Sequence, residues 1–381
     1  MSNFNWQEIK CVLVIKLRHH GDVLLTSPVI NQIKQHQPST EIDALVYEET
    51  AGMLRDLPSL NNLYLIKRGK RDQGLRDKYK TESSLVKQLK VRQYDLVIHL
   101  TESWRGAILC RLLKPKYSVV AKYPHRKGQQ TRLWKSSFTH HYPLPSRIRH
   151  TVDKHVDALR HLGMHPEKPS DLKLELAVNN NDREYVDRLI IQNNLQAGDY
   201  ILFHPTSRWL FKCWNESYAA QLIDQLIELG HPVVITSGPA ESERAMVSRI
   251  LGQCQQSPVD LSGQTTLKQL GGLISSSRLF VGVDSVPMHI AAAFQKPTVV
   301  LFGPSGDKEW GPWQTPCRVL VSDAPCRPCG MDGCAGSKRS DCIQSISTQH
   351  VLQSIQDLLQ DRYTAKTITV ESAVLPAVNS F

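Results

Sequence analysis

Short β-rich runs that alternate with helical segments constrain the fold of this chain most. In the first part of the chain, apolar runs at 11–17, 41–47, 62–67 and 94–100 are separated by segments whose apolar residues recur at helical spacing. A strand–helix–strand pattern repeated in this way predicts a parallel sheet covered by helices. A second series of the same kind begins at residue 200. The chain therefore reads as an α/β protein with two Rossmann-like halves.

The length of the chain supports two domains. A chain of 381 residues is too long for one hydrophobic core and fits two domains of ordinary size. The stretch 163–182 carries prolines and polar residues and is predicted to connect them. We expect an N-terminal domain over 1–170, a C-terminal domain over 171–350, a C-terminal helix over 351–365 and a flexible tail over 366–381.

Composition narrows the class of protein and of partner. Hydrophobic residues make up 41% and charged residues 22% of the chain, and no apolar run approaches the ~20 residues that span a membrane. The start, MSNFNWQEIK, has no basic region followed by an apolar one, which predicts a cytoplasmic protein with reduced cysteines. The net charge of +10 favours an anionic partner: nucleic acid, a membrane surface or a phosphorylated substrate.

Polar clusters follow four of the predicted strands. Gly21 and Asp22 come after the run 11–17, and similar clusters begin at Thr206, Gly238 and Asp284. In open α/β sheets, ligands bind at the carboxyl ends of the strands, where helix N-termini point. The four clusters are therefore candidates for one or two binding sites, although each single residue also fits the role of a helix cap.

The cluster at residue 284 has the features of a phosphate site. Asp284 or Ser285 is suited to cap a helix, and Pro287 is suited to its first turn, so free N–H groups and a positive dipole end would face a ligand. His289 lies in the same turn, where it either binds phosphate or packs in the core.

The other clusters of the second half supply the remaining groups for a nucleotide. Thr206 and Ser207 offer hydroxyls, Lys212 offers a cation for a diphosphate with Arg208 as its competitor, and Glu241 offers a carboxylate for ribose hydroxyls. No GxGxxG follows a strand and no GxxxxGK[ST] occurs, which disfavours a dinucleotide oxidoreductase and a P-loop NTPase.

A carboxylate in the first half of the chain is suited to be the base of a transfer reaction. Sugar transfer from a nucleotide donor needs a single base, because a diphosphate leaves readily once its charge is stabilised. Asp22 is that base on this interpretation, and Gly21 lets the chain bend sharply beside it. The alternative is that Asp22 only caps the following helix; Glu102, beyond the run 94–100, is then the next candidate for the base.

Four segments resemble the lipopolysaccharide heptosyltransferases, glycosyltransferase family 9. They are VLVIKLRHHGDVLLTSPVI, FHPTSRWLFKCW, SGPAESER and LFVGVDSVPMHIAAAFQKPTVVLFGPS, and the RHHGD form is similar to the heptosyltransferase III type. The resemblance implies a GT-B fold, two Rossmann-like domains with parallel sheets facing across a cleft. It also implies an ADP-heptose donor in the C-terminal domain, a heptose of the lipopolysaccharide inner core as acceptor in the N-terminal domain, and inversion at the anomeric carbon.

The resemblance also assigns residues and partners. It implies Asp22 as the catalytic base and a donor site made of Thr206, Ser207, Lys212, Glu241, Asp284, Ser285 and His289. The expected acceptor-binding residues are Arg18, His19, His20, Gly21, Lys67, Arg68, Arg126 and Arg132. Basic stretches at 67–80 and 125–135 would hold acidic sugars, phosphates or the cytoplasmic face of the inner membrane. No cofactor is required, and the sequence does not imply Mg²⁺.

A cysteine cluster and two other classes of protein complete the expectations. The cluster comprises Cys326, Cys329, Cys334 and Cys342, whose spacing approaches that of a zinc site; we favour thiols that pack a loop, without metal. A nucleic-acid-binding protein is disfavoured because few aromatic residues lie among the basic ones. A noncatalytic nucleotide-sugar-binding protein, or another nucleotide-sugar transferase of the same fold, remains open.

Overall fold

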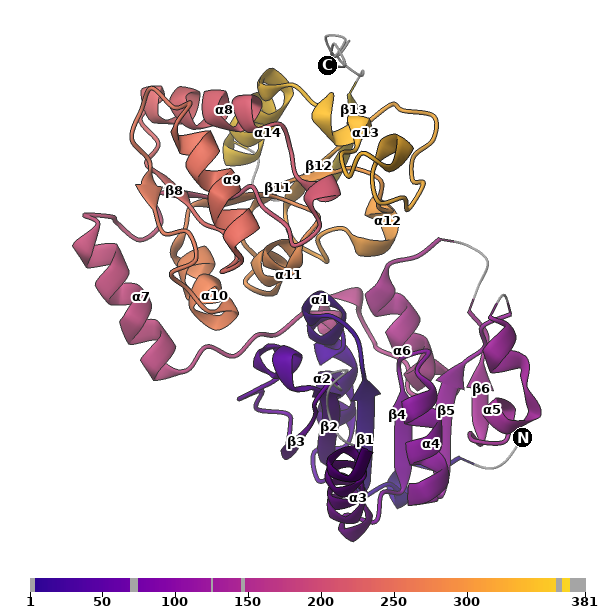
Figure 1. The fold of residues 1–381 in the computed structure, drawn as a ribbon. Coiled ribbons are helices and arrows are strands. Elements are labelled where there is room, and N and C mark those ends of the chain that lie inside the picture. Colours follow the sequence, from indigo (N-terminus) through magenta and orange to yellow (C-terminus); the bar gives the residue numbers. More distant parts are fainter. Residues whose placement is uncertain (1–3, 69–74, 125, 145–147, 361–364, 371–381) are drawn as a thin grey trace. The chain divides into compact units, whose positions relative to one another are not determined.

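The computed structural model describes residues 4–68, 75–124, 126–144, 148–360 and 365–370. The chain forms two compact units that divide between Ala177 and Val178, a few residues beyond the expected boundary. Figure 1 shows the elements of both units, which are described one at a time below.

The first unit is built on a six-stranded sheet with all strands parallel, in the order β3-β2-β1-β4-β5-β6. All six residues of β1 are buried, as expected for an apolar strand with helices on both faces of its sheet. The strands are β1 (Cys11–Lys16), β2 (Glu41–Tyr47), β3 (Asn62–Ile66), β4 (Leu96–His99), β5 (Tyr117–Ala121) and β6 (His140–Tyr142).

Helices cover both faces of this sheet. Leu13 and Ile15 of β1 pack in one core cluster with residues of α3, α4 and α5. Side chains of a strand alternate between its faces, so Val12 and Val14 face the other side, where α2 and α6 pack together. The helices are α1 (His20–Leu24), α2 (Ser27–His36), α3 (Leu75–Val91), α4 (Trp104–Leu113), α5 (Arg132–Lys135) and α6 (Thr151–His161), with the 3₁₀ turn η2 (Glu48–Met53) after β2.

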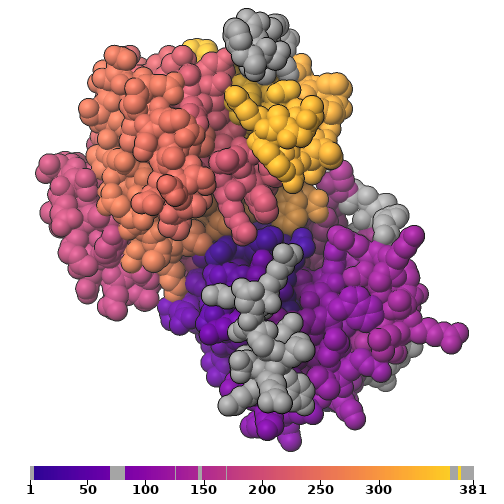
Figure 2. All heavy atoms as spheres, viewed as in Figure 1, coloured from indigo at the N-terminus to yellow at the C-terminus, as the bar shows by residue number. Residues whose placement is uncertain are grey.

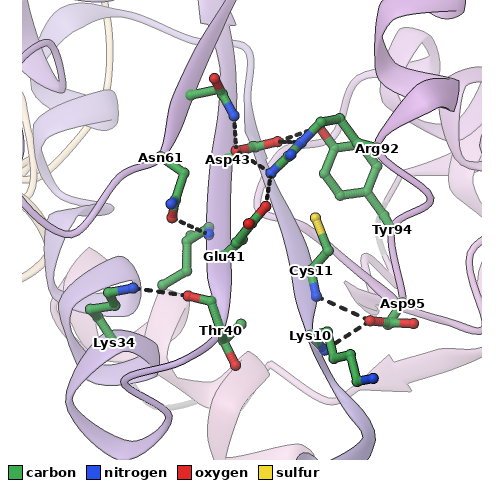
Figure 3. Close-up of polar contacts among 12 residues, drawn as sticks. Lys10, Cys11, Lys34, Thr40, Glu41, Asp43, Asn61, Arg92, Tyr94 and Asp95 are labelled. Atoms are coloured by element: carbon green, nitrogen blue, oxygen red, sulfur yellow. Dashed lines mark hydrogen bonds and ion pairs between the residues drawn. The ribbon is translucent and has the colours of Figure 1, made fainter.

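A polar network holds the amino ends of these strands (Figure 3). The fully buried Asp43 accepts hydrogen bonds from Arg92 Nε at 2.8 Å and from the Tyr94 hydroxyl at 2.8 Å. Burial and the charge of Asp43 raise the pKa of Tyr94, so its phenol stays a donor. Nearby, Asp95 accepts from the backbone N–H groups of Lys10 and Cys11. Because its buried carboxylate, Asp43, is paired with Arg92, we interpret this network as structural, at the sheet edge opposite α1.

The second unit has a seven-stranded parallel sheet in the order β13-β12-β11-β10-β7-β8-β9. The expectation of a flexible tail from residue 366 is wrong for its first part, because residues 365–370 form β13 and pair with β12. The run AKTITV is rich in β-branched residues, which fit a strand. The strands are β7 (Ile201–His204), β8 (Val233–Ile235), β9 (Val259–Asp260), β10 (Leu279–Val283), β11 (Thr298–Phe302), β12 (Cys317–Ser322) and β13 (Ala365–Val370).

Helices again form two layers. Phe203 of β7 lies in one core cluster with residues of α8, α9 and α14, while α10 packs against α7 and α11. The helices are α7 (Asn180–Gln192), α8 (Glu216–Glu228), α9 (Glu241–Leu251), α10 (Leu267–Ser276), α11 (Val286–Ala293), α12 (Asp307–Trp310), α13 (Asp341–Gln344) and α14 (Thr348–Gln360). Among the described residues, no helix has the length and apolar character needed to cross a membrane.

Both sheets reverse their strand order at the first strand of the unit. β1 lies between β2 and β4, and β7 lies between β8 and β10. Successive crossovers therefore run to opposite sides of β1 and of β7, which leaves a crevice at the carboxyl ends where α/β proteins bind ligands. The loops that begin there are the ones that carry Asp22, Thr206 and Asp284.

Candidate active site

In the first unit, Asp22 lies on the short helix α1, which starts at the carboxyl end of β1 (Figure 1). The N-cap of α1 is His19 and that of α2 is Thr26, so the interpretation of Asp22 as a helix cap is wrong. The Asp22 side chain is 11% exposed, and its Oδ1 lies 3.8 Å from both Lys16 Nζ and Arg18 Nε. A carboxylate at the carboxyl end of a parallel strand, where ligands of α/β proteins bind, can accept a proton from a bound hydroxyl.

Lys16 is a residue of this site that sequence reasoning missed. It is the last residue of β1 and only 5% exposed, and its Nζ donates to the Leu100 carbonyl oxygen at 2.9 Å and contacts His155 Nε2 at 2.8 Å. Burial lowers the pKa of Lys16 to about 8, and the charge of Asp22 opposes this shift. A lysine that ends an otherwise apolar strand was the signal that could have revealed it.

Part of the expected acceptor site gathers near α1. Arg68 Nη2 donates to the Arg18 carbonyl oxygen at 3.4 Å, while its Nε pairs with Glu49 of η2 at 2.6 Å. Lys67 pairs with Glu48 of the same turn at 4.0 Å. Arg18 itself is about half exposed. Two further lysine and arginine candidates of this stretch, Lys70 and Arg71, lie outside the described residues.

The other expected acceptor residues come from the loops and helices after β4 and β5. Arg126 pairs with Glu102 through a contact of 2.9 Å, so the fallback base Glu102 is already engaged in an ion pair. Arg132 opens α5 and is exposed. His20 and Gly21 lie within α1 itself, with Gly21 buried.

In the second unit, the loop after β7 meets the loop after β10. Lys212 Nζ donates to Asp284 Oδ2 at 2.6 Å. The next residue, Ser285, is the N-cap of α11; its hydroxyl is buried and makes no capping hydrogen bond. His289 is buried in the same helix. The structure therefore brings Lys212 together with Asp284 at the start of α11, as the clusters in the sequence suggest.

A second contact in this unit joins Thr206 to Glu243 rather than to Glu241. The Thr206 hydroxyl donates to Glu243 Oε2 at 2.8 Å, and the Gly238 N–H donates to the same oxygen at 3.3 Å. A Cβ at residue 238 would lie 2.5 Å from Glu243 Oε1, so only glycine lets the carboxylate approach this turn. Glu243 is buried, whereas Glu241 opens α9 and is exposed. Sequence reasoning missed Glu243 because it assigned the ribose contact to Glu241, the first acidic residue after the turn.

The other two candidate residues of the loop after β7, Ser207 and Arg208, both contact Trp209. The Ser207 hydroxyl accepts from the Trp209 N–H at 3.2 Å. The Arg208 guanidinium lies over the Trp209 ring at 5.3 Å, so Arg208 does not replace Lys212 beside Asp284. A pocket of about 260 Å³ adjoins Lys212, and it is lined by Trp209, Phe211, Lys212, Pro304, Ser305, Gly330, Met331 and Asp332.

One wall of this pocket belongs to the loop that carries the cysteine cluster. Arg327 fastens the loop to the end of β11, because its Nε donates to the Gly303 carbonyl oxygen at 2.6 Å. The cysteines differ in exposure: Cys326 and Cys329 are exposed, while Cys342 is buried. Within the described ranges, no three His, Cys, Asp or Glu side chains lie together so as to hold a metal ion.

The chain is similar in sequence to a known protein family and its members. The family model described as glycosyltransferase family 9 (heptosyltransferase) matches residues 83–338. The lipopolysaccharide heptosyltransferase 3 of Escherichia coli K12 is 38% identical over 300 residues, which are 78% of this chain and 83% of that protein.

Solved structures share the fold. A glycosyltransferase family 9 protein from Veillonella parvula superposes with a TM-score of 0.80 at 21% identity and covers 94% of this chain and 100% of its own. The E. coli heptosyltransferase WaaC, solved with ADP, has a TM-score of 0.70 at 19% identity and covers 91% of this chain and 99% of its own. The two reversed parallel sheets are thus those of a GT-B glycosyltransferase, and the chain belongs to glycosyltransferase family 9, the heptosyltransferases.

Proposed function

We propose that this enzyme moves L-glycero-D-manno-heptose from ADP-heptose to a heptose of the lipopolysaccharide inner core, with inversion of the anomeric carbon. Its relative in E. coli is named for heptose transfer to lipopolysaccharide, and its structural neighbour WaaC binds ADP. The observation that carries the proposal is the pair of half-sites. A carboxylate lies at the strand reversal of the first sheet, and a lysine and hydroxyls suited to a diphosphate lie at that of the second.

The donor half-site is assigned to the second unit. Lys212 donates one N–H to Asp284, and its side chain is 21% exposed. Its other two N–H groups are therefore available to a diphosphate at the start of α11. Thr206 and Glu243 offer a hydroxyl and a carboxylate at the neighbouring turn, and we assign the ribose hydroxyls to Glu243 instead of Glu241. In this assignment Lys212 and the helix N-terminus stabilise the charge of the leaving group.

The first unit is assigned to the acceptor. In the proposed step, the acceptor hydroxyl oxygen bonds to the anomeric carbon of heptose while the bond from that carbon to the diphosphate breaks. The proton of the hydroxyl goes to Asp22, and the electron pair leaves with ADP, whose charge Lys212 stabilises. A single displacement at one face of the sugar inverts its configuration. Arg18, His19 and His20 lie next to Asp22 in the chain, where they suit the phosphates of an inner-core acceptor.

The first unit also carries a surface suited to the cytoplasmic face of the inner membrane. Residues 103–152 contain no Asp or Glu and eleven Lys or Arg, at positions 105, 111, 114, 116, 122, 126, 127, 132, 135, 147 and 149. Ile108 of α4 and Leu133 of α5 are 53% and 55% exposed, and Arg111 joins the two helices by donating to the Ser136 hydroxyl at 2.9 Å. Figure 2 shows this part of the unit, in magenta, as a broad continuous surface. Cations interleaved with apolar side chains favour anionic lipid headgroups over a purely polar partner.

The function is tested by incubating the protein with ADP-heptose and a panel of truncated core acceptors, and by identifying the product by mass, linkage and anomeric configuration. We expect one added heptose with inverted configuration. No transfer to any heptose-bearing acceptor, or retention of configuration, would contradict the proposal.

The role of Asp22 has its own test. Asp22→Asn should lower kcat by roughly 10²- to 10⁴-fold, because an amide cannot accept the proton of the acceptor. Calorimetric binding of ADP should be unchanged, since the donor half-site lies in the other unit. Lys16 keeps its contacts with Leu100 and His155, so the variant should fold. Turnover near the wild-type rate would exclude Asp22 as the base.

Membrane contact is tested by sedimentation with vesicles. We expect the protein to sediment with phosphatidylglycerol-containing vesicles but not with phosphatidylcholine vesicles at low salt. Arg132→Glu combined with Lys135→Glu should reduce binding several-fold. Lys173→Glu, an exposed lysine of the same unit outside the acid-free stretch, is the matched control. Equal binding by both variants would contradict this surface.

A further inference from the structure

The ammonium group of Lys16 lies in a closed environment with three neighbours. Its Nζ donates to the Leu100 carbonyl oxygen at 2.9 Å, contacts His155 Nε2 at 2.8 Å and lies 3.8 Å from Asp22 Oδ1. An ammonium group has three N–H donors and no acceptor. Leu100 and His155 lie within hydrogen-bond distance of it, and Asp22 Oδ1 lies within ion-pair distance. Because Lys16 is almost fully buried, it cannot serve as a ligand-binding cation from solution.

The contacts of His155 determine which of its nitrogens carries the proton. Its Nδ1 lies 3.0 Å from the Leu25 carbonyl oxygen, which can only accept, so Nδ1 must be the donor. Burial and the charge of Lys16 lower the pKa of His155, which keeps the ring neutral. A neutral ring with its proton on Nδ1 leaves Nε2 as an acceptor, and Lys16 Nζ donates to it. His155 therefore orients the lysine, and the residue after α1 orients His155.

Other charged groups around Asp22 are more exposed or more distant. Arg18 reaches Oδ1 from outside and is 48% exposed. Glu102 and His99, at the end of β4, interact with the charge of Lys16. Among the neighbouring elements, η2 contacts α1 and contributes Glu48 and Glu49, which pair with basic residues that follow β3; the adjacent chain contributes His19 and His20. Lys16 is thus the buried cation in contact with the Asp22 carboxylate.

We propose that Lys16 and His155 are positioning residues for the transfer reaction, which orient the Asp22 carboxylate toward the acceptor hydroxyl. This inference rests on the proposed role of Asp22 as the base. His155 accepts one N–H of Lys16 and the Leu100 carbonyl accepts another, which directs the third toward Asp22 Oδ1. Neither residue touches a substrate: they act on the reaction through Asp22, from β1 and from α6.

The test compares kcat with KM in Lys16→Met, which keeps much of the side-chain volume but removes the charge and the hydrogen-bond donors. The value of kcat at the optimum should fall roughly tenfold to hundredfold through lost orientation, with little change in the KM for ADP-heptose. Lys10→Met, an exposed lysine just before β1, should change neither.

Two variants of His155 keep the inference testable if Lys16→Met is unstable. In His155→Gln, the amide can donate to the Leu25 carbonyl and accept from Lys16, so kcat should stay within about threefold of wild type. His155→Leu removes both contacts and should lower kcat as much as Lys16→Met does, again with little change in the KM for ADP-heptose. A purely structural role predicts that His155→Leu lowers the melting temperature while kcat stays near that of the wild type.

The outcomes separate this inference from the function on which it rests. If the wild type transfers heptose and Asp22→Asn does not, but Lys16→Met and His155→Leu keep the wild-type kcat, only the positioning role is wrong. If Asp22→Asn remains active, the base itself is misassigned. If the wild type transfers no heptose, the proposed function fails.

Discussion

At the residue scale, the candidate site of each unit pairs an aspartate with a lysine, and the two lysines differ in exposure. Lys16 and Asp22 are 3.8 Å apart with the lysine 5% exposed, whereas Lys212 and Asp284 are 2.6 Å apart with the lysine 21% exposed. The buried Lys16 is out of reach of a ligand and can affect one only through Asp22. The partly exposed Lys212 has N–H donors that a ligand can reach. The same pairing therefore suits a base in the first unit and a diphosphate site in the second.

The two acids of the turn after β8 give a prediction at this scale. Glu243→Gln should weaken ADP binding roughly tenfold to hundredfold, because a hydrogen bond to a charged group contributes about 1.5–3 kcal/mol. Glu241→Gln should stay within about twofold, since Glu241 is exposed and does not share the contact of Glu243 with Thr206. Titration calorimetry of ADP with both variants measures the difference. A larger loss for Glu241→Gln would return the ribose contact to that residue.

At the element scale, strands and helices with a strong local sequence pattern could be predicted, whereas those with a weak pattern could not. The predicted runs 11–17 and 41–47 correspond to β1 and β2. The sequence analysis did not identify β13, which lies in a stretch read as a tail, or α7, whose start lies in the predicted linker. Both depend on tertiary packing: β13 on the edge of β12, and α7 on α10.

The residues of the candidate site also divide into those that could be predicted from the sequence and those that could not. Asp22, Lys212 and Asp284 were predictable because each follows an apolar strand, where ligands of α/β proteins gather. Lys16 and Glu243 were not, because their importance comes from partners distant in the chain. Lys16 meets His155, which is 139 residues away, and Glu243 meets Thr206, which is 37 residues away. No local pattern encodes such contacts.

The packing of α4 on β4 gives a prediction about an element. A Cβ at Gly106 would lie 1.9 Å from His99 Nε2, so α4 approaches the end of β4 closely only because residue 106 is glycine. Gly106→Ala should therefore lower the free energy of unfolding by about 1–3 kcal/mol in urea titrations, although alanine favours a helix by about 1 kcal/mol.

The matched control for this prediction is Gly52→Ala in η2, where an added Cβ meets nothing within 4 Å. It should change the free energy of unfolding by less than about 0.5 kcal/mol. An unchanged or higher stability of Gly106→Ala would show that α4 can shift away from His99 at little cost.

At the scale of the whole molecule, buried histidines couple both units to pH. Burial lowers the pKa of His99 in the first unit and of His204 in the second to about 3, and it lowers that of His155 as well. His204 is held by Thr236, whose hydroxyl lies 2.9 Å from its Nδ1. These histidines stay neutral in the folded protein while they take up protons in the unfolded chain, so the stability of each unit is linked to their titration.

The last prediction is the sign and the window of that dependence. Below the ordinary histidine pKa of about 6.5, the unfolded chain binds more protons than the folded one, so the free energy of unfolding should fall as the pH drops from about 6.5 toward 5. Each buried histidine contributes up to about 1.4 kcal/mol per pH unit in this window, before carboxylates begin to titrate. Urea titrations at several pH values measure the slope. His204→Asn keeps a partner for Thr236 but cannot be protonated, and it should flatten the slope for the second unit. A stability that stays constant between pH 6.5 and 5, or the same slope in His204→Asn as in the wild type, would show that these histidines are protonated in the folded protein.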